Sequence, residues 1–135
     1  MLNQLLKTAV TSILALTSML VPYHATATES LSIDGLWTDV NTADFTNGTM
    51  IIAQDGDAIH VSHYVEYKGI AMVEYGIGSR KGRTLEYKVK VTRPIPGWVE
   101  EGRHILILSD DGQRLEGQYQ SNTGNGSLVF DRKGK

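Results

Sequence analysis

The chain has no cysteine among its 135 residues. This absence excludes a disulfide-stabilised scaffold, a zinc site with cysteine ligands and a cysteine nucleophile. Aromatic residues are scarce as well, with 2 Trp and 2 Phe, whereas 14 Gly and 41% hydrophobic residues make an ordinary globular composition. This length and composition predict a single domain with one hydrophobic core.

The chain also lacks a strong excess of charge of either sign, because its formal net charge is −2. The one basic cluster, Arg80-Lys81-Gly82-Arg83, falls on a predicted turn, where we expect the side chains to be solvated. Binding to nucleic acid or to an anionic membrane needs a clustered basic face. Neither partner is predicted.

The N-terminal segment has the composition of a signal peptide. Lys7 is its only charged residue, Thr8 to Val21 is almost uninterruptedly apolar, and Ala25-Thr26-Ala27 supplies the small residues of a cleavage site before Thr28. The apolar stretch is shorter than the roughly 20 residues that a membrane-spanning helix needs. We therefore predict a signal peptide over residues 1–27 and a secreted or periplasmic domain over residues 28–135, without stable membrane insertion after cleavage.

The rest of the chain is divided at short intervals by glycines that follow Asp, Asn or Lys, as in Asp55-Gly56, Lys68-Gly69 and Asp111-Gly112. Such pairs are typical of tight hairpin turns, and Asn47-Gly48 is predicted to form one too. Between the turns no apolar repeat of helical period is sustained. The segments of strand length are residues 33–40, 49–54, 58–67, 70–77, 84–92, 104–109, 114–120 and 127–132.

The segment 84–92 shows the strand pattern most clearly, because apolar residues alternate with Glu86, Lys88 and Lys90. Without helices, eight such strands can bury their apolar faces only in a barrel or a sandwich. Short connections favour pairing of sequential neighbours. We predict an all-β fold, an eight-stranded antiparallel up-and-down β-barrel, whose interior is either filled by side chains or wide enough for one small ligand.

Gly35-Leu36-Trp37 on the first strand and Arg132 at the end of the last strand resemble the motifs of the calycin superfamily, which includes lipocalins and avidins. The closing hairpins are similar to those of small exported bacterial lipocalin-like proteins. The resemblance covers most of residues 28–135. It implies that Arg132 stacks on Trp37 and closes one end of the barrel next to Gly35, a contact worth about 1 kcal/mol or more where it is desolvated.

Candidate catalytic and metal-binding residues do not form a recognisable pattern. His60 and His63 are three positions apart, which on a strand places them on opposite faces, although His104 can approach either of them. The paired acids Glu100-Glu101 and Asp110-Asp111 are expected in solvent on turns. We predict no enzymatic activity, no catalytic residue, no metal site and no cofactor.

The longest predicted loop, residues 92–103, contains two prolines that stiffen it and three large apolar residues, Ile95, Trp98 and Val99. If these side chains point outward, the loop is a lid or an anchor for a partner protein. If Trp98 points inward, the loop covers the barrel end.

Two functions are consistent with this sequence. The first is an exported, non-enzymatic binding protein that holds a small apolar molecule inside the barrel. The predicted inward-facing lining is Ile51, Met72, Leu85, Tyr87, Val89, Tyr119 and Phe130. The second is a protein-binding module, such as an inhibitor or an immunity-like factor, that contacts another exported protein through the loop from Pro94 to Trp98.

Overall fold

The computed structural model describes residues 31–41 and 45–134. The predicted signal peptide and its cleavage site lie outside the described residues. The described chain contains strands β1 (Gly35–Asp39), β2 (Phe45–Asp55), β3 (Ala58–Tyr67), β4 (Ile70–Lys81), β5 (Thr84–Val91), β6 (Glu101–Leu108), β7 (Arg114–Ser121) and β8 (Gly124–Arg132). Within these residues there is no helix of the length and hydropathy needed to cross a membrane.

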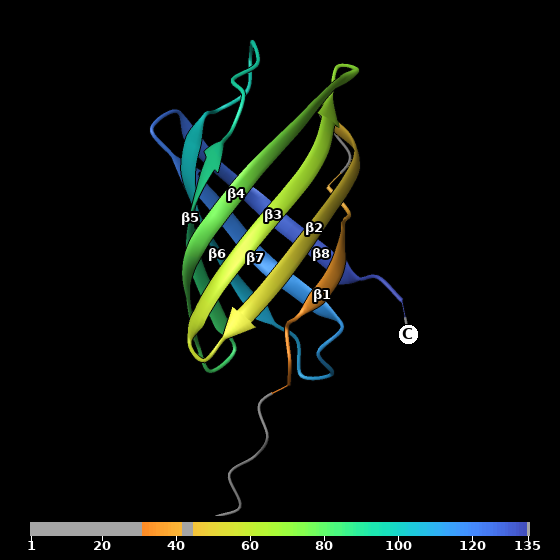
Figure 1. Cartoon of the computed structure of the whole chain (residues 1–135), viewed down its shortest axis with the longest axis vertical. Coiled ribbons are helices and arrows are strands. Elements are labelled where there is room, and N and C mark those ends of the chain that lie inside the picture. The colour runs from red at the N-terminus through yellow and green to blue at the C-terminus, as the bar shows by residue number, and fades with distance from the viewer. Residues whose placement is uncertain (1–30, 42–44, 135) are drawn as a thin grey trace, which may run out of the picture.

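The eight strands form a closed barrel in which each strand pairs with its sequence neighbours, and β8 returns to β1 (Figure 1). Every pairing is antiparallel, including the closing pair, in which Trp37 stands opposite Arg132. The predicted all-β, up-and-down barrel is therefore confirmed. The bounds of β3 are those predicted, because Asp55-Gly56 and Lys68-Gly69 form the tight turns on either side of it.

Five strands, β2, β4, β6, β7 and β8, are longer than the sequence pattern indicated. The predicted turn at Asn47-Gly48 is wrong, because these residues form an irregularity within β2, with a register shift between Thr46 and Thr49. β4 continues to Lys81, and β8 already begins at Gly124. A glycine beside a polar residue marks a bulge as readily as a turn, so the dipeptide alone does not distinguish them.

Alternate connections lie at opposite ends of the barrel. We call the end with the β1–β2, β3–β4, β5–β6 and β7–β8 connections the open end; it is uppermost in Figure 1. The other end, which the segment before β1 enters from below, is called the closed end. The inward-facing residues are mostly apolar near the closed end and include several polar and ionisable side chains near the open end.

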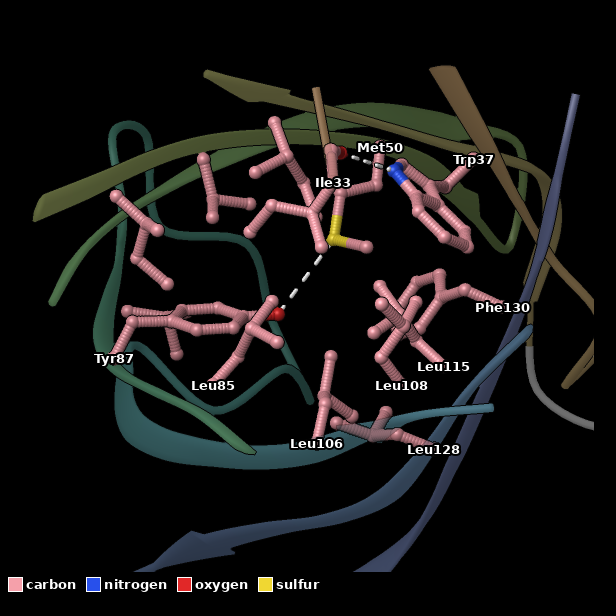
Figure 2. Close-up of a cluster of buried hydrophobic side chains, with 14 residues drawn as sticks. Ile33, Trp37, Met50, Leu85, Tyr87, Leu106, Leu108, Leu115, Leu128 and Phe130 are labelled. Carbon is pink, nitrogen blue, oxygen red and sulfur yellow. Dashed lines mark hydrogen bonds between the residues drawn. The ribbon is translucent and has the colours of Figure 1, made fainter. Parts of the chain in front are cut away.

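A packed hydrophobic core extends from the closed end into the middle of the barrel (Figure 2). Trp37, Tyr87 and Phe130 are the largest of its fully buried side chains. The indole Nε1 of Trp37 donates a hydrogen bond to the carbonyl of Ile33, which holds the entering segment across the barrel base. This part of the interior is filled by side chains.

Arg132 seals the closed end, as the resemblance implied. Its guanidinium lies 4.3 Å from the centroid of the Trp37 ring. It donates to the carbonyls of Gly112 (2.9 Å), Asp34 (3.0 Å) and Ser32 (2.6 Å). Gly35 has a φ of 123°, which side chains rarely adopt, so a glycine is required where the chain turns beneath Arg132.

Arg80 is a second cation at the closed end; it is buried, whereas Arg132 is only partly buried, and the prediction that Arg80 is solvated is wrong. It occupies an inward position of β4, and its guanidinium donates to the carbonyls of Leu31 and Gly82 and to Oε1 of Gln54. These neutral acceptors replace the water that the charge loses on burial.

Candidate functional site

The open end of the barrel contains a cavity of about 530 Å³. All eight strands and the β5–β6 loop contribute to its wall. The lining residues with polar or aromatic side chains are Asp39, Asn41, Phe45, His63, Tyr67, Glu74, Trp98, Glu101, His104, Tyr119, Ser121 and Ser127. Three carboxylates are in this set, and no Lys or Arg of the described chain lines the cavity.

Three ionisable side chains are buried side by side on one wall of the cavity. His63 on β3 stands directly opposite Glu74 on β4, and both side chains point inward. His63 Nδ1 lies 2.9 Å from Oε1 of Glu74, and His63 Nε2 lies 3.2 Å from Oδ2 of Asp39. The exposed fractions of Asp39, His63 and Glu74 are 4%, 4% and 6%. We call these three residues the acid–imidazole triad.

Gly48 makes the contact between Asp39 and His63 possible. Asp39 lies on β1 and His63 on β3, so the carboxylate has to pass over the intervening strand β2. A Cβ at Gly48 would lie only 2.6 Å from Cβ of Asp39 and 3.0 Å from the Phe45 ring. The irregularity in β2 therefore places a glycine at the one point where Asp39 needs the space.

The triad carries one net negative charge. Burial by itself lowers the pKa of His63, but the adjacent Asp39 and Glu74 outweigh burial and raise this pKa to about 9, so the imidazole is protonated at neutral pH. Burial raises the pKa of Glu74, yet the hydrogen bond and the charge of His63 bring it below its usual value. Two carboxylates thus share a single imidazolium.

The hydrogen bonding of the triad is incomplete as well. Oδ2 of Asp39 and Nε2 of His63 are enclosed and close together, but they do not form a well-directed hydrogen bond. The other oxygen, Oδ1, accepts from the backbone and side-chain nitrogens of Asn41. On the Glu74 carboxylate the bond to His63 uses Oε1 and not Oε2.

His104 is a neutral polar group in the same cavity. Burial lowers its pKa to about 4, and the positive charge of His63 acts in the same direction against the opposing charges of Glu74 and Asp39. Its Nδ1 lies 3.1 Å from the hydroxyl of Tyr87, which also contacts Sδ of Met50 at 3.5 Å (Figure 2). Burial raises the pKa of Tyr87 well above its usual value, so the phenol stays neutral. The bond to Tyr87 uses Nδ1 of His104 and not Nε2.

Three aromatic rings form another part of the cavity wall. The Trp98 ring meets Phe45 at a centroid distance of 5.9 Å and Tyr67 at 5.2 Å, with interplanar angles of 76° and 63°. The rings therefore stand at steep angles to one another rather than in a stack. They pack on a second buried apolar cluster formed by Val65, Met72, Val91 and Ile95. We call Phe45, Tyr67 and Trp98 the aromatic wall.

The residues predicted to line a ligand site fall into three groups. Val89 and Tyr119 line the cavity. Met72, Leu85, Tyr87 and Phe130 are buried in the two packed apolar clusters. The inward orientation predicted for Ile51 is wrong, because its side chain is 52% exposed on the outer face of β2. Within β2 the inward positions are Met50 and Ile52, and Ile51 between them faces outward; a run of consecutive apolar residues does not by itself show which of them point inward.

The β5–β6 loop turns its apolar residues toward the barrel. Ile95 is only 8% exposed, so it does not have the outward orientation of the first alternative. Trp98 is half-buried between Phe45 and Tyr67, which corresponds to the inward alternative. Val99 lines the cavity and is the most exposed of the three at 36%.

Sequence reasoning did not select Asp39 or Glu74, although one signal for Glu74 was present. Glu74 occupies the inward-facing position of β4 between Met72 and Gly76, and an acidic residue is unusual at such a position. His60 and His63 do lie on opposite faces, as predicted. In the part of the chain that the structure describes, no group of three or more His, Asp or Glu side chains is arranged to hold a metal ion.

Comparison with protein-family models, with curated proteins and with solved structures finds no match to this chain. Its function is therefore inferred from the cavity itself.

Proposed function

We propose that this chain is an exported, non-enzymatic binding protein that holds a small molecule in the cavity at the open end of the barrel. The observation that carries the proposal is the coincidence of that cavity with buried ionisable side chains and an aromatic wall. Concave sites with apolar walls and a few well-placed polar groups are the usual form of small-molecule sites.

The two ends of the interior support this assignment in different ways. Near the closed end the core is filled, and Trp37 and Arg132 block access. At the open end a volume of about 530 Å³ is left, which is in the range of sites for small organic molecules. An apolar part of the ligand would contact Val89, Tyr119 and the aromatic wall. A polar part would face the triad and His104.

Export and membership of the calycin superfamily belong to the same proposal. They rest on the composition of residues 1–27 and on the Gly35, Trp37 and Arg132 motif. The alternative, a protein-binding module that uses the loop from Pro94 to Trp98, is less well supported, because Ile95 and Trp98 contact the barrel instead of projecting from it.

The test is titration of the purified protein with N-phenyl-1-naphthylamine, a neutral dye that fluoresces in apolar sites, together with native mass spectrometry for a co-purified molecule. We expect one dye per chain. Val89→Phe fills the cavity and should weaken dye binding by about tenfold or more. Lys88→Phe, its neighbour on the outer face of β5, should leave binding unchanged.

Circular dichroism and urea unfolding would verify that both variants fold. Absence of dye binding and of any co-purified molecule would overturn the proposal. Equal losses in Val89→Phe and Lys88→Phe would overturn it too, because the dye would then be bound outside the cavity.

A further inference from the structure

We propose that the ligand of the open-end cavity is an organic cation, a protonated or quaternary amine with an apolar substituent, which the triad and the aromatic wall recognise together. This inference rests on the proposed function and specifies the chemical class of the ligand. It comes from the sign of the buried charge and from the chemistry of the adjacent wall.

The charge balance of the cavity favours a cationic ligand. Asp39 and Glu74 bring two buried carboxylates, and His63 is the single cation between them. The third lining carboxylate, Glu101, is at the exposed rim, where it lies 3.1 Å from Nζ of Lys90. One negative charge is therefore left in the open-end cavity without a cationic partner in the described chain, because the buried Arg80 lies at the closed end and donates to neutral acceptors. Burying an unpaired charge is costly, and a bound cation would remove this cost.

The triad also leaves one carboxylate oxygen without a hydrogen bond to His63. Oδ2 of Asp39 is fully enclosed and faces Nε2 of His63, whereas Oε2 of Glu74 is not used by His63 and the Glu74 side chain keeps some exposure in the cavity, so Glu74 is the acid that a ligand can contact. An ammonium group carries up to three N–H donors and no acceptor, so it complements carboxylate oxygens. A carboxylate or phosphate ligand would instead add negative charge beside Glu74.

The aromatic wall adds a second attraction, because the faces of electron-rich rings attract cations. Phe45, Tyr67 and Trp98 line the same cavity as Glu74, and Trp98 meets the other two rings edge to face. Nζ of Lys68 already lies over the Tyr67 ring, 5.0 Å from its centroid, so Trp98 and Phe45 are the rings that a ligand cation would contact. His104 does not compete for the site as a second cation, because it is neutral at physiological pH. It offers a hydrogen-bonding nitrogen only.

Three ligands with similar bodies test the charge requirement: 2-phenylethylamine, 2-phenylethanol and phenylacetate, measured by calorimetry at pH 7. We expect the amine to bind one per chain, at least about tenfold more tightly than the alcohol, and phenylacetate not to bind. Trimethyl(2-phenylethyl)ammonium should bind as well, since the aromatic wall does not require an N–H group.

Glu74→Gln keeps the size of the side chain and removes its charge. It should reduce the preference for the amine over the alcohol by about tenfold. Glu116→Gln makes the same change of charge on the exposed face of β7 and should leave this preference unaltered. Trp98→Leu should weaken the quaternary ammonium more than the alcohol, whereas Tyr75→Leu on the outer face should affect neither.

The outcomes separate the two proposals. If the protein binds N-phenyl-1-naphthylamine or 2-phenylethanol but does not prefer the amine, the cavity binds ligands and the cationic class is wrong. If none of these probes binds, the proposed function fails as well. A loss of amine preference in Glu116→Gln equal to that in Glu74→Gln would also overturn the inference, because the preference would then reflect the overall charge of the protein.

Discussion

The two ends of the barrel bury charge in opposite ways. At the closed end, Arg132 and Arg80 donate to neutral oxygens of the chain, most of them backbone carbonyls, and Arg132 also stacks on Trp37. At the open end, Asp39, His63 and Glu74 pair mainly with one another and line a cavity. A buried charge whose hydrogen bonds are all made within the chain holds the fold together. A buried charge that lines a cavity and keeps an oxygen without a hydrogen bond is the kind of group that the proposed function assigns to ligand binding.

Strand β4 shows this difference within one element. Its inward face carries Glu74 toward the open end and Arg80 toward the closed end, with two glycines between them. Both side chains are buried. Their surroundings differ. The segment before β1 supplies a carbonyl acceptor to Arg80, whereas Glu74 shares the imidazole of His63 with Asp39 and lines the cavity.

The largest expected effect is at the closed end. Trp37→Ala removes a fully buried indole and the surface on which Arg132 stacks, so we expect a loss of about 3–5 kcal/mol in the free energy of unfolding. Urea unfolding followed by circular dichroism measures it. Leu36→Ala on the outer face of the same strand is the matched control and should cost under about 1 kcal/mol. Similar losses in the two variants would contradict the sealing role of Trp37.

At the open end, His63→Gln should destabilise the protein by about 3 kcal/mol at pH 7, because it leaves two buried carboxylates without their cation. His60→Gln, on the outward face of β3, should change stability by less than about 0.5 kcal/mol. Adding Glu74→Gln to His63→Gln should recover part of the loss. If the double variant is less stable than His63→Gln, repulsion between the carboxylates is not the cause.

The stability of the protein should pass through a maximum near pH 6.5. The folded-state pKa of His63 is raised to about 9, so its contribution is complete below pH 6.5 and is lost as pH rises toward 9. The folded-state pKa of His104 is lowered to about 4, so its contribution is present above pH 6.5 and is lost as pH falls toward 4.

Each of these losses should be on the order of 3 kcal/mol. Urea unfolding at several pH values measures both. His63→Gln should flatten the alkaline side only, and His104→Gln should flatten the region between pH 6.5 and 4. An alkaline side that is unchanged in His63→Gln would mean that His63 is not the group that titrates there.

The smallest expected effect on stability is that of Trp98→Ala. Trp98 is half-buried in the wall of a cavity, whereas Trp37 is fully enclosed, so we expect a cost of about 1 kcal/mol, well below that of Trp37→Ala. The same unfolding experiment compares the two tryptophans directly. Equal costs would show that the open end is as tightly packed as the closed end.

Local patterns were sufficient to predict the strands, and they failed where two distant parts of the chain meet. The turns around β3 were predicted because Asp-Gly and Lys-Gly pairs act over a few residues. Asn47-Gly48 has the same local chemistry, yet it forms an irregularity that makes room for Asp39 from another strand. Arg80 was expected in solvent because its acceptors, Leu31 and Gln54, are remote in the sequence.

The candidate site was harder to predict than the fold for the same reason. His63 and Glu74 become neighbours through the register of β3 with β4, and Asp39 reaches them only after β1 has joined the barrel. A sequence shows which residues can carry charge, but the proximity of their side chains depends on strand register and barrel closure.

By itself the sequence determined that the chain forms β-strands with alternating faces, and it located most of the tight turns. Through a family resemblance it also indicated that Trp37 and Arg132 close the barrel. These features depend on neighbouring residues or on a short motif. Only the tertiary structure decided which end of the interior is filled, which inward residues line the cavity, and that its buried charge is negative. Barrel closure brings residues from all eight strands into one volume, and their burial and net charge exist only once that volume is formed.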